Sequence, residues 1–338
     1  MKSIKTEEAV GMALAHDVTA MYDGFKGALF KRGHVIKEED IEKLLDIGKK
    51  TVYVGEPDEG LLHEDECARR LAEITGISEG HFTGPAEGKM LLISDIKGML
   101  RIDTELLREI NSIGDITIAT LPDHYRVEKD TAVASMRIVP LYTEKEQIER
   151  AEELSGDRKL IRLLPYKEKK VGVIITGSEV YSGRISDKFE PVIRKKLEYY
   201  PAEIVGVKIC DDDKLMIVEV ARELLGGGAD LLVFTGGMSV DPDDLTPGAI
   251  RELGADIVSH GVPAQPGNMT LVAYLGDIPI LGVPGAAISL PTTMLDVMLP
   301  QIFTGERFTK KELISLGDGG LCQKCRPCHY PNCTFGRY

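Results

Sequence analysis

Three aspartates crowd one short stretch of this chain, FTGGMSVDPDDLTPG at residues 234–248. Asp241, Asp243 and Asp244 repel one another, and a cation or a donor-rich ligand would offset that repulsion. The paired glycines ahead of them permit positive φ and let backbone N–H groups approach an anion. Thr246 with its following proline favours a helix start just beyond. A phosphate on these amides, bridged by Mg²⁺ to Asp244, fits the pattern because Mg²⁺ takes one or two carboxylates plus ligand oxygens.

Two further strands are expected to end in glycine and run into polar loops, within ITGSEVYSGRISDKF at residues 175–189 and ILGVPGAAIS at residues 280–289. A purely structural interpretation exists, because glycine-rich strand ends are common in doubly wound proteins and acids near a helix start can simply complement its positive end. Open parallel sheets, however, bind ligands at the carboxyl ends of their strands. A ligand site is therefore the favoured interpretation.

The elements that must position these loops follow from the hydrophobic pattern after residue 170. Apolar runs alternate with amphipathic stretches, which predicts an α/β fold: a mostly parallel sheet with helices on both faces. The expected strands are 171–177, 202–209, 230–236, 255–262 and two near residues 271 and 278. The expected helices are 188–199, 214–225, 247–253 and a long final helix ending near residue 303.

A smaller α+β region precedes this part of the chain. KGALFKRGHVIKEEDIEKLLDIGKKTVYV from Lys26 and KGMLRIDTELLREINSIGDITIAT from Lys97 share an order of Lys-Gly, strand, acid-capped helix, Ile-Gly and β-rich run. This order predicts two small β-α-β units, related either by duplication or by chance. The charged, helix-favouring segment from Thr143 indicates a linker helix. We therefore expect an N-terminal module at 1–76, a second module at 77–142, a linker at 143–169, the α/β domain at 170–306 and a tail at 307–338.

Composition limits the classes of function. Asp and Glu outnumber Lys and Arg by 54 to 41, so the net charge of -13 argues against broad binding to nucleic acid or to an anionic membrane. The N-terminal sequence lacks the apolar stretch of a signal peptide, and no charge-free apolar run reaches membrane-spanning length. We expect a cytoplasmic protein that holds an anionic ligand locally. Two isolated cysteines, Cys67 and Cys210, are expected to be small buried hydrophobes.

The other four of the six cysteines crowd the last 17 residues. Cys322, Cys325, Cys328 and Cys333 form a C-x2-C-x2-C-x4-C array, and such clustering in a reducing compartment indicates metal binding rather than disulfides. Two successive C-x2-C steps are typical of iron–sulfur ligation, whereas structural zinc sites usually pair two knuckles across a longer spacer. An iron–sulfur cluster, a zinc ion and free thiols on a frayed tail all stay open. Six basic residues face two acids at 307–338, so the tail could touch an anionic ligand or a metalloenzyme that receives it.

The stretch from residue 170 to about 303 resembles a known family. It is similar to the molybdopterin-binding domain shared by molybdopterin molybdotransferases, of the MoeA and gephyrin E types, and molybdopterin adenylyltransferases of the Mog type. The motifs that carry the resemblance are TGSEV, SGRISD, the DDD at 211–213, TGGMSVDPDD followed by TPGAI, QPGN and GVPGAA, all in the family's order. The resemblance implies molybdenum cofactor biosynthesis, with the molybdotransferases as the nearest match.

The resemblance also implies roles for individual residues. The residues expected to line the pterin and phosphate pocket are Thr176, Gly177, Ser178, Asp187, Gly236, Gly237, Met238, Ser239, Pro284 and Gly285. The acids expected at the catalytic, metal-handling site are Glu179, Asp212 and Asp244, with Glu179 and Asp244 as metal ligands. In the transferases this site inserts molybdate into the dithiolene of adenylated molybdopterin, with Mg²⁺ assisting and AMP leaving. Catalysis would then rest mainly on positioning and charge neutralisation.

Several positions depart from the transferase pattern. Thr-Gly-Asp-Glu reads Thr-Gly-Ser-Glu, with Ser178 in place of a carboxylate, and Asp-Ser-Asn reads Asp-Lys-Phe, which introduces Lys188. Asn268 stands where Pro-Gly-Lys-Pro has a phosphate-binding lysine, and Ala286 replaces the Asn of Leu-Pro-Gly-Asn-Pro. Lys188 could supply the charge lost at Asn268. These departures keep a non-catalytic molybdopterin carrier, or an insertion chaperone for a recipient molybdoenzyme, open beside a molybdotransferase-like transferase.

A third class is a nucleotide-processing enzyme of the competence-damage type, which uses a related domain but would not explain the cysteine tail. Members of the family commonly self-associate, so the resemblance implies a homo-oligomer whose ligand is molybdopterin or its adenylated form. The sequence does not decide between molybdate and tungstate.

Overall fold

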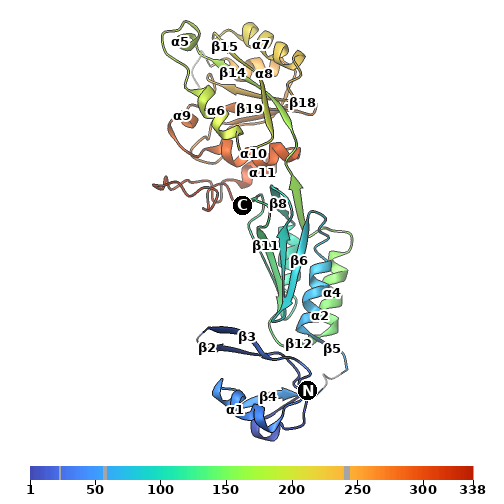
Figure 1. Cartoon of the computed structure of the whole chain (residues 1–338). Helices are drawn as coiled ribbons and strands as arrows, with labels where there is room; N and C mark the ends of the chain where they lie inside the picture. The colour runs from blue at the N-terminus through green and yellow to red at the C-terminus, as the bar shows by residue number, and fades with distance from the viewer. Residues whose placement is uncertain (23, 56–58, 240–243, 338) are drawn as a thin grey trace. The chain divides into compact units, whose positions relative to one another are not determined.

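The chain divides into two units in the computed structural model, which describes residues 1–22, 24–55, 59–239 and 244–337. The first unit comprises Met1–Asp95, Ile102–Leu121 and Asp130–Arg162. The second comprises Ile96–Arg101, Pro122–Lys129 and Leu163–Tyr338. Figure 1 shows the helices and strands of each unit, coloured along the chain. Two short stretches from the middle of the chain therefore belong to the second unit.

The first 54 residues form a small α+β arrangement around an apolar core. Its strands pair antiparallel, β1 (Lys2–Lys5) with β4 (Thr51–Val54) and β2 (Val18–Tyr22) with β3 (Phe25–Phe30). A 3-10 turn, η1 (Thr6–Glu8), and the helix α1 (Glu38–Asp46) accompany them. Leu14, Ile36 and Leu44 are buried at its centre. The first turn of α1 is acidic, which complements the positive helix end.

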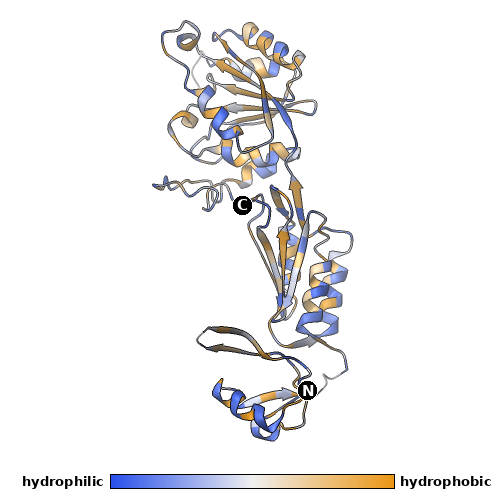
Figure 2. Cartoon of the chain, in the orientation of Figure 1, coloured by the Kyte–Doolittle hydropathy of each residue, from blue (hydrophilic) through white to orange (hydrophobic). Residues whose placement is uncertain are grey.

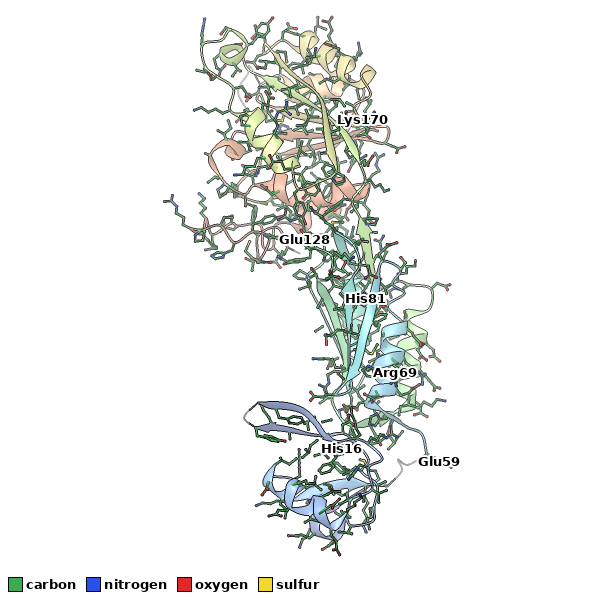
Figure 3. All side chains as sticks on the ribbon, in the orientation of Figure 1. His16, Glu59, Arg69, His81, Glu128 and Lys170 are labelled. Carbon is green, nitrogen blue, oxygen red and sulfur yellow. The ribbon has the colours of Figure 1, made fainter. Side chains whose placement is uncertain are left out.

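An antiparallel sheet covered by helices forms the rest of the first unit. The strand order is β6 (Gly80–Ala86), β7 (Lys89–Ser94), β11 (Ala132–Ile138) and β9 (Ile116–Thr120). A separate pair joins β5 (Leu61–His63) and β12 (Tyr142–Glu144). The helices are α2 (Glu64–Glu73), which contacts β7 and β11, α3 (Thr104–Asn111) and α4 (Lys145–Ser155). Arg69, labelled in Figure 3, is on the exposed side of α2, whereas Leu71 is fully buried.

The two segments with a similar order of sequence features, from Lys26 and from Lys97, each form a strand, a helix and a second strand. The first contains β3, α1 and β4, and the second contains β8 (Gly98–Ile102), α3 and β9. Their strands pair elsewhere, however: β3 with β2, β4 with β1, β8 with β10 (Arg126–Val127), and β9 with β11. Neither segment is therefore a β-α-β unit whose two strands lie side by side. The strand β13 (Ile161–Pro165) completes the sheet of β10 and β8.

A six-stranded sheet is the scaffold of the second unit, in the order β15-β14-β16-β19-β18-β17. Four neighbours run parallel: β15 (Ala202–Cys210), β14 (Lys169–Thr176), β16 (Leu231–Thr235) and β19 (Ile278–Val283). The strands β18 (Leu271–Leu275) and β17 (Asp256–His260) continue it antiparallel. The expected mostly parallel α/β sheet is therefore confirmed. Figure 2 shows its central strands in hydrophobic colours, as burial on both faces requires.

Helices cover both faces of this sheet, as expected. On one face α6 (Phe189–Leu197), α10 (Met294–Thr304) and α11 (Lys310–Ser315) share a core with Val173. On the other, α7 (Lys214–Gly226) and α8 (Thr246–Glu252) pack with Ile174. Phe303 and Phe234 fill the two cores, and truncating either to alanine would cost about 3–5 kcal/mol. Two short helices, α5 (Ser178–Tyr181) and α9 (Ala286–Ser289), follow strand ends. None of the described helices has the length and apolar character to cross a membrane.

Candidate functional site

One cleft lies at the carboxyl ends of the neighbouring strands β14, β16 and β19. The segments that follow these strands supply most of its lining, and Asn268 and Met269 add to it from the connection between β17 and β18. Its volume is about 1380 Å³. This exceeds the roughly 300–1,000 Å³ of ordinary small-molecule pockets, so a ligand larger than a simple metabolite can enter. Parallel strands place these loops at one sheet edge, which is why segments far apart in sequence meet here.

All of the residues expected to bind the pterin and its phosphate line this cleft. They are Thr176, Gly177, Ser178, Asp187, Gly236, Gly237, Met238, Ser239, Pro284 and Gly285. The acids expected at the metal-handling site, Glu179, Asp212 and Asp244, line it too. Asp241 and Asp243, on which the sequence argument also drew, lie outside the described residues.

Close packing explains the pair of glycines after β16. Gly236 has φ 85°, and a Cβ there would clash with the carbonyl oxygen of Thr176. Gly237 has φ 55°, and a Cβ there would lie 2.6 Å from Thr246 Oγ1. Both positions thus exclude a side chain by conformation and by space. Because neither glycine has a side chain, the loop after β16 packs against the end of β14, and the backbone of this loop borders the cleft.

Two buried threonines fix the same loops. The Oγ1 atoms of Thr176, at the end of β14, and Thr246, at the start of α8, lie 3.2 Å apart. Thr176 Oγ1 donates to the carbonyl oxygen of Thr235 at 3.3 Å, and Thr246 Oγ1 donates to that of Gly236 at 3.2 Å. These bonds tie the ends of β14 and β16 to each other and to the start of α8. The sequence motif TGG therefore encodes loop geometry as well as space for a ligand.

The three consecutive aspartates after β15 have different partners. Asp213 caps α7, and its Oδ1 accepts the Met216 N–H at 2.8 Å. Ser178 holds the other two: its Oγ donates to Asp211 Oδ1 at 2.5 Å, and its N–H donates to Asp212 Oδ2 at 2.9 Å. Of the three, Asp212 lines the cleft. Ser178, which replaces a carboxylate of the family pattern, is thus the donor that orients Asp212.

Glu179 and Asp244 border the cleft from different loops. Glu179 has an exposed side chain on α5, and a Cβ on Gly177 would lie 3.7 Å from its Oε2. Asp244 is half-buried just before α8. Among the described residues, no three His, Cys, Asp or Glu side chains form a group that could hold a metal ion. These acids could therefore share a cation with ligand oxygens but do not enclose one by themselves.

Two residues expected to contact the cofactor have other side-chain partners. Asp187 caps α6, because its Oδ1 and Oδ2 accept the N–H groups of Phe189 and Glu190, each at 2.8 Å. The Met238 side chain is 3% exposed and packs in the core under α7 and α8, so Met238 borders the cleft mainly with its backbone. His260 Nε2 lies 3.1 Å from the Met238 carbonyl oxygen. Nothing in the scattered histidines of the sequence indicated that contact.

Lys188 brings positive charge to the cleft. Among the described residues that line it, Glu179, Asp187, Asp212 and Asp244 are acids and Lys188 is the basic one. The lining also includes Asn268, which replaces the family's lysine. The lysine introduced in one loop and the lysine lost from another therefore border the same space. An anionic ligand here would depend on Lys188 for ion pairing.

The isolated cysteines are buried, as expected. Burial, together with the neighbouring Asp212, Asp211 and Asp213 carboxylates, raises the pKa of Cys210 to about 11. Burial likewise raises the pKa of Cys67 to about 12. Both thiols stay protonated at neutral pH, and a protonated thiol is a poor nucleophile and metal ligand. Cys210 is therefore a packing residue even though it ends a strand beside the cleft.

The C-terminal tail packs on the second unit instead of fraying. Phe335 is 3% exposed, and Tyr330 Oη donates to the carbonyl oxygen of Asp296 at 2.9 Å. A hollow of about 450 Å³ lies between the tail and residues 289–292. Its lining includes all four tail cysteines, Cys322, Cys325, Cys328 and Cys333. In the part of the chain that the structure describes, these thiols do not converge as a group that could hold one ion. Their ligation of a cluster or of zinc stays a prediction.

Residues 172–304 match the family described as "Probable molybdopterin binding domain". The matched residues lie in the second unit, and the match confirms the resemblance inferred from the six ordered motifs. Residues 3–56 match a second family, described as a domain of unknown function (DUF8806).

Curated relatives align with only a fraction of this chain. A CinA-like protein of Mycobacterium sp. (strain JLS) is 34% identical over 90 residues, which are 26% of this chain and 21% of that protein. The molybdopterin molybdenumtransferase of Bacillus subtilis (strain 168) is 32% identical over 127 residues, 34% of this chain and 28% of that protein. The chain thus spans less than a third of either relative's length. The tungsten cofactor synthesizing protein MoaB from Pyrococcus furiosus aligns with 40% of this chain and 94% of its own, at 25% identity and a TM-score of 0.36.

Proposed function

We propose that the cleft binds molybdopterin or its adenylated form and assists the Mg²⁺-dependent insertion of molybdate. One observation carries this proposal: the glycine-containing loops after β14, β16 and β19, together with Glu179, Asp212 and Asp244, line one cleft within the molybdopterin-binding domain. Exposed backbone N–H groups in such loops bind phosphate oxygens, and carboxylates bind hard cations. The presence of both kinds of group in one cleft supports the binding of a pterin phosphate together with a cation.

The donor set of the cleft fits Mg²⁺. Mg²⁺ usually keeps several waters and takes one or two carboxylates plus phosphate oxygens of the substrate, so it needs no closed protein cage. Glu179 and Asp244, on separate loops, would hold it, and when bound it would neutralise charge on the phosphates. Asp212, oriented by Ser178, would position molybdate through ordered water. Lys188 would pair with the terminal phosphate of the pterin.

In the proposed reaction, the two dithiolene sulfurs of the pterin replace two oxygen atoms of molybdate, which leave as water, and a water molecule attacks the phosphoanhydride so that AMP leaves. The chain's own residues do little covalent chemistry. They hold the phosphate on backbone N–H groups, keep the carboxylates apart until a cation joins them, and limit the freedom of the bound pterin. Such positioning and charge stabilisation are the usual protein contributions to reactions at phosphate.

A non-catalytic carrier or insertion chaperone is the second candidate function. Asp187 already binds two N–H groups of α6, and Ser178 replaces a carboxylate, so fewer oxygens are available for a metal than in the family pattern. Such a cleft could bind the pterin tightly without turning it over. The tail on the same unit would then suit contact with a recipient molybdoenzyme.

One experiment separates these candidates. Purified full-length protein is incubated with adenylated molybdopterin, Mg²⁺ and molybdate, and AMP release and pterin binding are both measured. For the transferase we expect Asp244→Asn and Glu179→Gln to slow AMP release by roughly 100-fold, the usual effect of losing one electrostatic group at the reacting centre. Asp213→Asn is the matched control, because it removes the same charge outside the cleft and asparagine still caps α7.

The outcomes have distinct meanings. AMP release that falls in the cleft variants but not in Asp213→Asn supports the transferase. Tight pterin binding without AMP release supports the carrier. Absence of pterin binding by the unaltered protein overturns both, since both require the cleft to hold molybdopterin.

A further inference from the structure

We propose that the C-terminal tail holds an iron–sulfur cluster in the hollow of about 450 Å³ formed with residues 289–292. The site is separate from the molybdopterin cleft. Its protein ligands are Cys322, Cys325, Cys328 and Cys333, four thiols that line this single hollow.

The ends of the tail are anchored while its middle is exposed. The Cys322 N–H donates to the Gln265 carbonyl oxygen at 2.8 Å, and the Gly336 N–H donates to that of Gly319 at 3.1 Å. Cys322 and Cys333 are half-buried against the core under α10, whereas Cys325 and Cys328 are exposed. Residues 322–329 form no helix or strand. The two exposed thiols can therefore adjust to a ligand while the other two stay fixed.

The spacing of the cysteines favours a cluster over a single ion. Structural zinc sites usually pair two knuckles across a longer spacer, whereas successive C-x2-C steps are typical of iron–sulfur ligation. In an iron–sulfur cluster the thiolates bind different irons around an inorganic core, so they surround a space. The four tail thiols share the lining of one hollow, which is the kind of space that a cluster would occupy.

The surroundings of the hollow suit an anionic centre. Four thiolates around a cluster carry net negative charge, and Lys324 and Arg326 are part of the same lining. The Lys324 N–H already donates to Cys322 Sγ at 3.4 Å, and Thr292 Oγ1 lies 3.2 Å from Cys328 Sγ. Hydrogen bonds to cysteine sulfur stabilise the thiolate and tune a bound cluster. The helix α9 leads directly into residues 289–292 and contributes Ala286 and Ile288 to the molybdopterin cleft. A centre in the hollow would thus stiffen one wall of that cleft.

Anaerobic reconstitution tests the proposal. Full-length protein is incubated with ferrous and ferric salts and sulfide, and assembly would release one proton from each of the four thiols. After desalting, iron and acid-labile sulfide per chain and the visible absorption are measured. We expect equal amounts of iron and sulfide with a broad visible band, and at least a roughly tenfold loss of both in Cys325→Ala and Cys328→Ala. Both side chains are exposed, so neither variant should change the unfolding temperature of the metal-free protein.

Two controls sharpen the result. Cys67→Ala removes a buried thiol of the first unit and should leave the iron content unchanged. His329→Ala should also retain the cluster, because the four thiols suffice as ligands. The proposal is overturned if iron and sulfide wash out of the unaltered protein. It is also overturned if Cys325→Ala and Cys328→Ala bind as much as the unaltered chain, or if only one Zn²⁺ per chain is retained in competition.

Discussion

Lys188 is the single side chain on which an anionic ligand would depend most. The other charged residues described in the cleft lining are carboxylates, which would repel a bound phosphate. Lys188 and the backbone N–H groups are the groups that would attract it. The preceding Asp187 is fixed by two N–H groups of α6, which holds the backbone that carries Lys188. The position introduced into the family pattern is therefore a built part of the site.

We predict that Lys188→Met weakens molybdopterin binding about tenfold, the effect expected when a charge-assisted hydrogen bond to phosphate is lost. Lys188→Arg should bind within about threefold of the unaltered protein, because arginine also pairs with phosphate. Lys195→Met is the matched control, since Lys195 is exposed on α6, the helix that follows Lys188, and does not line the cleft. Pterin fluorescence titration measures the three affinities. Equal affinity of Lys188→Met and Lys195→Met would contradict this role.

Individual side-chain roles were predictable only where a motif implied them. The glycine loops and Asp244 are predictable because strand-end loops meet at one edge of a parallel sheet, whereas Glu179 and Asp212 are implied only by the family resemblance. The contact of His260 with Met238 depends on tertiary placement, and no local pattern marks it. The cap at Asp187 has a local signal, an aspartate just ahead of a helix start.

At the level of elements, the helix expected to end near residue 303 is the 11-residue α10, and a separate short helix, α9, precedes it. The chain leaves α9 at Ser289, passes Pro291, and begins α10 at Met294. A capping box starts α10, in which the Thr293 N–H donates to Asp296 Oδ2 at 2.7 Å. The Thr-x-x-Asp pattern was present in the sequence and would have located this break. In the first unit the strand-helix-strand order of two segments is predictable, but the other strands and the strand partners are not, because antiparallel pairing is decided by long-range packing.

The helix α2 begins at a histidine that must stay neutral. His63 Nδ1 accepts the Asp65 N–H at 3.2 Å, so this nitrogen carries no proton. The ring is 9% exposed and packs edge-on against Tyr142, with centroids 5.1 Å apart. Burial lowers the pKa of His63 below its usual 6.5, Arg32 and His16 add to that shift, and Asp65 and Asp17 oppose it. Protonation would therefore remove the cap and charge a buried ring.

We predict that acid destabilises the first unit through this cap. Because the folded-state pKa is lowered, the unfolded chain binds more protons as pH falls through 6.5, and stability that is complete above that pH is lost below it. The unfolding temperature should be lower at about pH 5.5 than at about pH 7.5, and His63→Asn, which keeps a helix cap, should remove roughly half of that difference. His16, whose pKa burial also lowers, acts in the same direction.

Calorimetry of the full chain at the two pH values measures this effect. His81→Asn serves as the control, because His81 is exposed and its Nδ1 lies 2.6 Å from Asp95 Oδ1, away from any helix cap. A pH difference that is unchanged in His63→Asn would show that the cap is not responsible.

At the scale of the whole molecule, the second unit is built from three separate stretches of the chain. Lys97 Nζ donates to the Tyr199 carbonyl oxygen at 2.6 Å and lies 3.6 Å from the centroid of its ring. Arg126 packs over the rings of Tyr199 and Tyr330, and Tyr199 Oη donates to Glu128 Oε1 at 2.7 Å (Glu128 is labelled in Figure 3). The short stretches 96–101 and 122–129 therefore stabilise helices and tail that follow them by dozens of residues.

Arg101 makes a second set of such contacts within this unit. It pairs with Asp123, Glu306 and Glu312, and its side chain is 17% exposed. Partly buried arginine networks of this kind contribute more to the free energy of unfolding than isolated surface ion pairs do. Hydrophobic pattern alone places a domain boundary at residue 170 and does not indicate these long-range contacts.

We predict that a chain of residues 163–338 keeps the cleft and its ligand but loses stability. Every residue that lines the cleft follows residue 175, so molybdopterin affinity should stay within about threefold of the full chain. The contacts of Lys97, Arg101 and Arg126 are removed, each worth about 1 kcal/mol or more, so the unfolding temperature should fall by roughly 5–10 °C. Full-length protein with Arg101→Ala and Arg126→Ala should also have a lower unfolding temperature. This variant tests the two side chains without removing the rest of the first unit. Calorimetry measures the unfolding temperature, and pterin titration measures the affinity. If the truncated chain unfolds at the same temperature as the second unit does in the full chain, the structural role of the two inserted stretches is contradicted.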